Sequence, residues 1–75
     1  MNARIKVQKT CSTLIIDEYT KLPAELYVKI MQNSFVASIT GDRQLTCVLP
    51  NGNELNEIWK HLTIISDIAK VEMIG

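Results

Sequence analysis

The segment that most constrains the fold is residues 34–50, SFVASITGDRQLTCVLP. Small and apolar residues alternate with polar ones on both sides of Gly-Asp-Arg. An alternation with a period of two is typical of half-buried strands, and a glycine followed by polar residues is typical of a turn. The segment therefore predicts two antiparallel strands joined in a hairpin.

The apolar pattern also predicts the register of this hairpin. If residues 41–43 form a three-residue connection, Ile39 faces Leu45 and the polar residues face each other on the other side. A two-residue loop would place Ile39 against Gln44, and a slip by one residue exchanges the two faces. The common three-residue turn has its glycine third, whereas Gly41 comes first here. One face should pack against helices through Phe35, Ala37, Ile39, Leu45, Cys47 and Leu49.

Three further segments have strand patterns. Residues 3–9 alternate, with Ile5 and Val7 on one side. Residues 12–18 contain a β-branched run, which predicts a central strand buried on both faces. Residues 69–74 alternate weakly and predict a closing strand.

A first helix is predicted over residues 23–32. Pro23 fits a first helical position, where its missing N–H costs nothing, and Glu25 places an acid in the first turn. Thr20 or Leu22 would then be the cap. Apolar residues recur every four positions through this segment, which gives one buried stripe.

A second helix is predicted after the break at residues 50–53. Asn51 and Glu54 have the spacing of a capping box. Residues 60–65 leave two alternatives, because the β-branched run there fits the end of a helix or a strand. The apolar stripe of this helix consists of Leu55, Ile58, Trp59 and Leu62.

The order of these elements predicts one α+β domain covering residues 1–75. Apart from the additional N-terminal strand, the order is the β-α-β-β-α-β of a ferredoxin-like sandwich. Such a sheet has helices on one face only. The other face must be solvated, covered by a ligand or covered by another subunit.

Charge and composition argue against several classes of function. Eight basic and eight acidic residues are dispersed along the chain, so no basic surface that could bind nucleic acid is expected. No apolar run approaches the roughly 20 residues that span a bilayer, and the N-terminus does not resemble a signal peptide, so we expect a cytoplasmic protein without membrane contact. Cys11 and Cys47 lack a Cys-x-x-Cys neighbour, which predicts free thiols and no metal site.

The hairpin also carries a family resemblance. Phe35-Val36-Ala37-Ser38-Ile39-Thr40, a turn and Gln44-Leu45-Thr46-Cys47-Val48 resemble the hairpin of ACT-like domains, in particular the bacterial tandem-ACT proteins related to cytosolic arginine sensors. The segments Arg4-Ile5-Lys6-Val7 and Trp59-Lys60-x-Leu62-x-Ile64 resemble two further parts of that family. The turn is one residue shorter than in the family, and the chain has the length of one such module.

The resemblance implies a non-catalytic regulatory module. Modules of this family bind an amino acid or a similar metabolite between two modules, through the loop before the first helix. The resemblance implies a homo-oligomer, such as a homodimer, and it implies no cofactor. The simpler interpretation of Thr20 is a helix cap. Carried to matching positions, the resemblance predicts ligand-binding residues Asp17, Tyr19, Thr20 and Lys21, with Ser38 or Thr40 nearby.

A second hypothesis is a protein-interaction module or small inhibitor that binds a protein partner through its open sheet face or an edge strand. Tyr27 and Trp59 would be interface anchors, since aromatic residues are enriched at such positions. The alternative for Trp59 is packing of the second helix onto the sheet. An enzyme is not expected, because His61 is the only histidine and the adjacent Asp17 and Glu18 would point to opposite faces of a strand.

Overall fold

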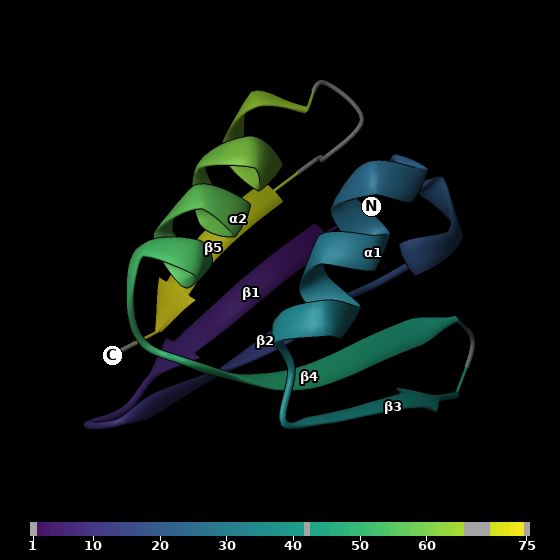
Figure 1. Ribbon diagram of the computed structural model, residues 1–75. Coiled ribbons are helices and arrows are strands. Elements are labelled where there is room, and N and C mark those ends of the chain that lie inside the picture. Colours follow the sequence, from purple (N-terminus) through teal and green to yellow (C-terminus); the bar gives the residue numbers. More distant parts are fainter. Residues whose placement is uncertain (1, 42, 66–69, 75) are drawn as a thin grey trace.

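The computed structural model describes residues 2–41, 43–65 and 70–74, and it places both helices on one face of a five-stranded sheet (Figure 1). Two helices and a short 3₁₀ turn connect the strands. In chain order the elements are β1 (Asn2–Val7), β2 (Cys11–Ile16), η1 (Tyr19–Lys21), α1 (Ala24–Asn33), β3 (Val36–Thr40), β4 (Gln44–Pro50), α2 (Asn53–Ile64) and β5 (Lys70–Ile74).

The order of strands across the sheet is β3-β4-β2-β1-β5. Neighbouring strands run antiparallel, except that β5 runs parallel to β1. The α+β class is therefore confirmed, and so is a closing strand at the end of the chain. The N-terminal strand β1 lies between β2 and β5, an arrangement that is compatible with a ferredoxin-like fold carrying one inserted strand.

The predicted register of the β3–β4 hairpin is confirmed. Ile39 pairs with Leu45 and Ala37 with Cys47, across a connection of three residues. Its third residue, Arg43, takes the left-handed conformation with φ 63°, which a glycine usually adopts at this place. Gly41 is also left-handed, with φ 55°. The first and third residues of this turn are therefore both left-handed, and the third is an arginine, for which this conformation is costly.

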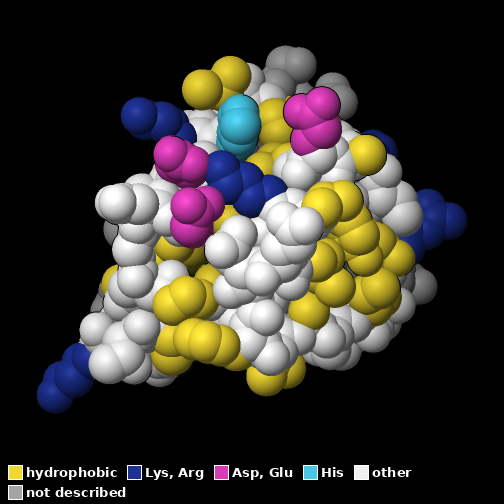
Figure 2. Space-filling model, in the orientation of Figure 1, with side chains coloured by type: hydrophobic (Ala, Val, Ile, Leu, Met, Phe, Trp, Pro, Cys, Tyr) yellow, Lys and Arg dark blue, Asp and Glu magenta, His cyan; other side chains and the backbone are white. Residues whose placement is uncertain are grey.

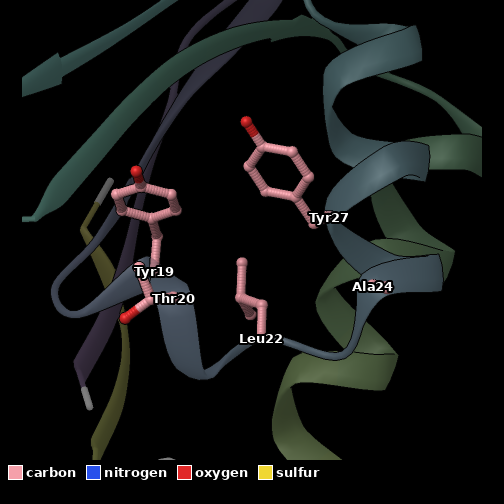
Figure 3. A pocket seen from close by; sticks show the side chains of 5 residues that line it. All are labelled: Tyr19, Thr20, Leu22, Ala24 and Tyr27. Atoms are coloured by element: carbon pink, nitrogen blue, oxygen red, sulfur yellow. The ribbon is translucent and has the colours of Figure 1, made fainter.

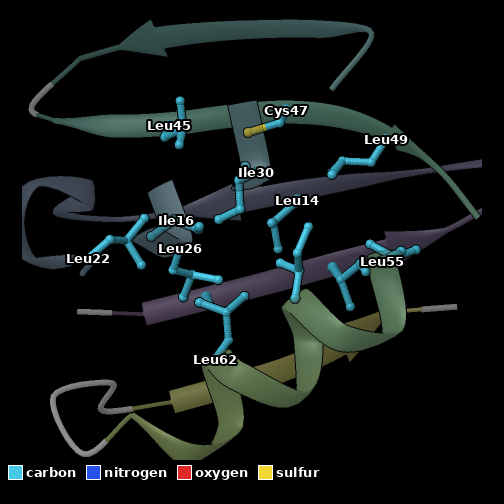
Figure 4. Packing of buried hydrophobic residues seen from close by; sticks show 13 residues of the cluster. Leu14, Ile16, Leu22, Leu26, Ile30, Leu45, Cys47, Leu49, Leu55 and Leu62 are labelled. Atoms are coloured by element: carbon cyan, nitrogen blue, oxygen red, sulfur yellow. The ribbon is translucent and has the colours of Figure 1, made fainter. Parts of the chain in front are cut away.

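The hydrophobic core lies between the helices and one face of the sheet (Figure 4). The prediction that residues 12–18 are buried on both faces is wrong. Leu14 and Ile16 are fully buried, but Thr13 and Ile15 on the other face remain half-buried, because both helices cover the same side. The buried hydrophobic residues are Ala3, Ile5, Leu14, Ile16, Leu22, Leu26, Ile30, Leu45, Cys47, Leu49, Leu55, Ile58 and Leu62.

Only the β4 half of the hairpin's apolar face lies in this core. The sequence had predicted that the whole face packs against the helices, and this prediction is wrong for β3. Leu45, Cys47 and Leu49 on β4 are fully buried, whereas Ile39 is 53% exposed and Phe35 is 68% exposed. The reason is position in the sheet. β3 is the edge strand, and α1 packs on β4 and against α2, so β3 extends beyond the helices.

The start of α1 also differs from the prediction. The helix begins at Ala24, and Pro23 occupies the cap position with φ −57° and ψ 141°. No side chain caps the helix. Thr20 lies in η1 instead, so neither it nor Leu22 is the helix cap. The fixed φ of proline sets the direction of the chain into the helix without a capping hydrogen bond.

α2 runs to Ile64, so the helical alternative for residues 60–64 is confirmed and the strand alternative is wrong. The capping box is also wrong, because Gly52 occupies the cap position. The Asn51 side chain instead accepts a hydrogen bond from the Ser12 hydroxyl (2.5 Å) and donates to the Gln8 carbonyl oxygen (2.7 Å). Asn51 therefore links the end of β4 to the β1–β2 turn through these hydrogen bonds.

No helix in the described part of the chain is long and apolar enough to cross a membrane. Cys11 and Cys47 are both free thiols, as predicted. Burial raises the pKa of the Cys47 thiol, and a hydrogen bond with Ser34 opposes that shift only in part. Cys47 is therefore an unreactive core residue.

Candidate functional site

The loop that enters α1 forms an open hollow of about 270 Å³ on the surface (Figure 3). η1 supplies one wall and the first turn of α1 supplies the other. Apolar and aromatic side chains dominate its lining, with one added hydroxyl group. The lining residues are Tyr19, Thr20, Leu22, Ala24 and Tyr27.

Local backbone geometry creates this hollow. Glu18 takes a left-handed conformation with φ 56°, which turns the chain sharply at the end of β2. The Leu22 amide donates to the Tyr19 carbonyl oxygen (3.0 Å), and Leu22 is then extended before Pro23. The loop is fixed to the hairpin as well, because the Tyr19 amide donates to the Arg43 carbonyl oxygen (3.1 Å).

Two tyrosines stack at the centre of the site. The ring centroids of Tyr19 and Tyr27 are 5.9 Å apart, and their planes are inclined by 28°. Such a pair contributes about 0.5–1.5 kcal/mol beyond the area it buries. Figure 3 shows both hydroxyl groups directed away from Leu22, so the hollow has an apolar floor and a polar end. That combination suits a small ligand with an apolar part and a polar head.

A second group of predicted residues lies where β2, β3 and β4 meet. The Gln44 side-chain amide donates to the Asp17 carboxylate (2.8 Å), and the Thr40 hydroxyl donates to the Gln44 side-chain oxygen (3.3 Å). Thr40 and Gln44 are on the opposite face of the hairpin from Ile39 and Leu45, so this chain of hydrogen bonds is on the helix-free face.

The structure therefore divides the predicted ligand residues. Tyr19 and Thr20 line the hollow, whereas Asp17 and Thr40 belong to the hydrogen-bonded group around Gln44. Lys21 is exposed and forms an ion pair of 3.1 Å with Glu18, and Ser38 is exposed on β3. The hydrogen bond and charge of Lys21 lower the pKa of the Glu18 carboxyl group.

Two lining residues were not predicted from the sequence. Leu22 and Ala24 flank Pro23. Because a proline favours an extended conformation in the residue before it, Pro23 was the signal in the sequence that the chain bends here and forms a hollow. Tyr27 was predicted as an interface anchor, and the structure places it in the hollow.

Trp59, the other predicted anchor, is half-buried and packs against the hydrophobic core, as the alternative interpretation expected. It also lines a second hollow of about 390 Å³ beside the start of α2.

A third feature is an ion-pair cluster between the helices. Lys29 lies 2.6 Å from a carboxylate oxygen of Glu57 and 3.7 Å from one of Glu54. The hydrogen bond with Glu57 raises the pKa of Lys29, and the same bond lowers the pKa of Glu57. His61 lines the same surface hollow as Lys29 and Glu57, and Figure 2 shows acidic, basic and histidine side chains close together on the helix face. Among the described residues, no three histidine, cysteine or acidic side chains gather where they could hold a metal ion.

Comparisons with known proteins give no family for the chain. No protein-family model matches it, and neither the curated proteins nor the solved structures contain a match.

Proposed function

We propose that the chain is a non-catalytic regulatory module that binds an amino acid or a similar small metabolite and acts as an oligomer. The ligand lies in the hollow between η1 and α1. The polar head of the ligand lies near the hydroxyl groups of Tyr19 and Tyr27, and its apolar part lies over Leu22.

The observation that carries the proposal is the stacked tyrosine pair inside an open hollow. Both rings are half-buried and pack against the hydrophobic core, which fixes their positions. Sites for small organic molecules are commonly lined by aromatic and apolar side chains with a few polar groups, such as the two tyrosine hydroxyls. The volume of about 270 Å³ is slightly below the usual range of about 300–1,000 Å³ for ligand pockets, which favours a small ligand. A second subunit that covers the open side would exclude more water from the ligand.

The resemblance to ACT-like domains is part of this proposal. It is supported by the element order, by the position of the hollow in the loop before the first long helix, and by the one-sided helix layer. In this interpretation the sheet is a ferredoxin-like sandwich in which β1 is an inserted strand. The eight basic and eight acidic residues of the chain balance each other, which favours a protein that binds neither nucleic acid nor membrane, and we place it in the cytoplasm as part of this proposal.

Thermal-shift screening against the amino acids and the common nucleotides tests the proposal. A ligand at 100 times its Kd adds about 2.7 kcal/mol to the free energy of unfolding, which corresponds to a rise in Tm of roughly 11–22 °C for a domain of this size. We expect one group of related small molecules to give such a shift.

Two variants locate the binding site. Tyr27→Leu removes the ring stack and the hydroxyl group but keeps an apolar side chain, and it should abolish the shift. Asn56→Ala changes the second hollow beside Trp59 and is the matched control, which should keep the full shift. A flat screen with the wild type, or a shift that survives Tyr27→Leu, contradicts the proposal.

A protein-interaction module is the second candidate. Several large apolar side chains are exposed on and beside the edge strand β3, including Phe35 and Ile39. Such a surface favours a protein partner over a metabolite. A flat ligand screen together with a defined 1:1 complex that is lost in Ile39→Lys would favour this function.

A further inference from the structure

The connection between β4 and α2 contains the pair Asn51-Gly52. The backbone nitrogen that follows an asparagine can attack the side-chain amide carbon of that asparagine. Glycine hinders this attack least, because it has no Cβ atom and the greatest conformational freedom. The chain has five asparagines, and Asn51 is the one that a glycine follows. The sequence therefore favours attack at Asn51 over the other four.

The attacking nitrogen is open to solvent. Gly52 is exposed, and a Cβ atom at this position would have no neighbouring atom within 4 Å. Its φ of 152° lies in a region that side chains rarely adopt. Within residues 2–41, 43–65 and 70–74, the Gly52 N–H has no hydrogen-bond acceptor. Water can therefore remove the proton from this nitrogen, which is the first step of an attack.

The group under attack, the side-chain amide of Asn51, is held in place. Nδ2 donates to the carbonyl oxygens of Gln8 (2.7 Å) and Lys9 (3.3 Å), and Oδ1 accepts from the Ser12 hydroxyl (2.5 Å). Attack on Cγ turns this planar carbon into a tetrahedral one and moves both atoms out of line with their partners. Because hydrogen bonds weaken steeply as they depart from linearity, all three oppose the attack. The contact with the β1–β2 turn therefore protects Asn51.

We infer that Asn51 is a site of deamidation and that its contact with the β1–β2 turn sets the rate. The Gly52 nitrogen loses its proton to water and bonds to Cγ of Asn51. The Cγ–Nδ2 bond breaks, and Nδ2 takes up a proton and leaves as ammonia. The resulting succinimide ring adds one water molecule and opens to aspartate or isoaspartate. The net reaction consumes one water molecule and releases one ammonia molecule, with no oxidant or reductant.

The product cannot keep the contacts of the asparagine. Nδ2 donates two hydrogen bonds, whereas an ionised carboxylate only accepts them. An aspartate at this position sets its negative oxygen against the carbonyl oxygens of Gln8 and Lys9, and these acceptors repel each other. The hydrogen bond from Ser12 is the one of the three that an aspartate can still accept. Deamidation therefore loosens the end of β4 from the β1–β2 turn.

A new negative charge before α2 also has a favourable interaction. No side chain caps this helix, so its first amide groups attract an anion. On an exposed turn this attraction is screened by salt, whereas the repulsion acts between atoms at hydrogen-bond distance. We therefore expect the loss of the two donated hydrogen bonds to outweigh the attraction to the helix.

The modification also changes the second hollow. Asn51, Asn56 and Trp59 line this hollow of about 390 Å³ beside the start of α2. None of its described lining side chains is charged, so an aspartate at position 51 supplies the first charge there. Fluorescence of Trp59 therefore provides a local probe of the reaction, because indole emission responds to nearby charge and water.

Peptide mapping by mass spectrometry, on wild-type protein folded and unfolded in urea, tests the inference. In urea, we expect aspartate and isoaspartate to form at Asn51 at least about tenfold faster than at Asn53, because a glycine follows only Asn51. In the folded chain, the rate at Asn51 should be at least about tenfold lower than in urea, since the reaction then waits for local opening. Asn53 is the internal control, exposed in the same segment and followed by Glu54.

Two variants test the role of the hydrogen bonds. Ser12→Ala removes the donor to Oδ1 and should speed deamidation of Asn51 in the folded chain several-fold. Thr13→Ala is the matched control, because it removes a hydroxyl group from the opposite face of β2 and should leave the rate unchanged.

Three results would overturn the inference. Asn51 could react no faster than Asn53 in urea, it could react as fast in the folded chain as in urea, or a folded Ser12→Ala could react at the wild-type rate. If Ser12→Ala does not fold, the two comparisons in the wild type decide the outcome.

Asn51→Asp reproduces the aspartate product. It should unfold at a lower urea concentration than the wild type. Asn53→Asp adds the same charge at the exposed start of α2, and it should not lower that concentration. An Asn51→Asp chain as stable as the wild type contradicts the effect assigned to the modification. None of these measurements uses a ligand or a second copy, so their outcome is independent of the proposed function.

Discussion

The two strands of one hairpin, β3 and β4, have the same alternation of residues and opposite environments. Leu45 and Cys47 on β4 are fully buried, whereas Ile39 and Ala37, which pair with them directly, are 53% exposed and half-buried. β4 lies between two strands and under α1, and β3 lies at the edge of the sheet. The comparison teaches that alternation determines which face a side chain takes, and that position in the sheet determines whether that face is covered.

The largest expected difference is in stability. Leu45→Ala should lower the free energy of unfolding by about 2–5 kcal/mol, because it leaves a cavity in a fully buried site. Ile39→Ala, at the paired position, should cost less than about 1 kcal/mol in the monomer, since half of that side chain is already in water. Urea unfolding at low protein concentration measures both. Equal losses in the free energy of unfolding would show that the edge strand β3 is packed as well as β4.

The far end of β4 should be the next most sensitive point. Asn51→Ala removes the acceptor of the fully buried Ser12 hydroxyl and the donor to the Gln8 carbonyl, with an expected loss of about 1–3 kcal/mol in urea unfolding. Asn53→Ala, an exposed neighbour at the start of α2, is the control and should change little. A neutral Asn51→Ala would mean that β4 is held in place by its flanking strands alone.

The turn between the two strands carries a smaller and opposite effect. Arg43→Gly should raise the free energy of unfolding by about 0.5–1 kcal/mol relative to Arg43→Ala, since glycine takes a left-handed conformation without the penalty of a Cβ atom. Comparison with the alanine variant removes the effect of losing the arginine side chain. If the two variants unfold at the same urea concentration, the left-handed φ of 63° is not a source of strain.

The smallest effect concerns the helix layer far from β3. The pKa of Glu57 is lowered by Lys29, so the pair stabilises the native state above the ordinary glutamate pKa of about 4.3 and loses this contribution as the pH falls through the lowered pKa. The raised pKa of Lys29 keeps the contribution until strongly alkaline pH. The difference in Tm between wild type and Glu57→Gln should be small, because the pair is exposed.

That difference should vanish once the pH has fallen below the lowered pKa of Glu57, and also in about 1 M salt, where the Debye length is only about 3 Å. Thermal unfolding at several pH values and salt concentrations measures it. A Glu57→Gln difference in Tm that is unchanged at low pH would show that the charge of Glu57 is not its source.

Much of the fold could be predicted from the sequence because its signals are local. The alternation around Gly41 and Arg43 gave the correct hairpin register, and the apolar stripe through Leu55 and Ile58 gave the second helix. The exposure of Phe35 could not be predicted in this way, since it depends on which strand ends the sheet. The role of Asn51 was missed because its partners, such as Ser12, are distant in sequence.

The candidate site was predictable only in part for the same reason. The loop before the first helix was the correct place to look, and Tyr19 and Thr20 do line the hollow. Tyr27 joins them because one helical turn beyond Pro23 brings its ring to within 5.9 Å of Tyr19, which is a tertiary contact. Asp17 and Thr40 are drawn instead into the hydrogen-bonded group around Gln44 on the other face.

Amide hydrogen exchange at two protein concentrations tests most directly whether position in the sheet determines which strand of the hairpin is protected. β2 and β4 are paired on both sides, so their protection should be high and independent of concentration. We predict that residues 36–40 of β3, which have a neighbouring strand on one side only, exchange faster than β4 at the lower concentration. Protection of β3 as high as that of β4 at the lower concentration would contradict the account.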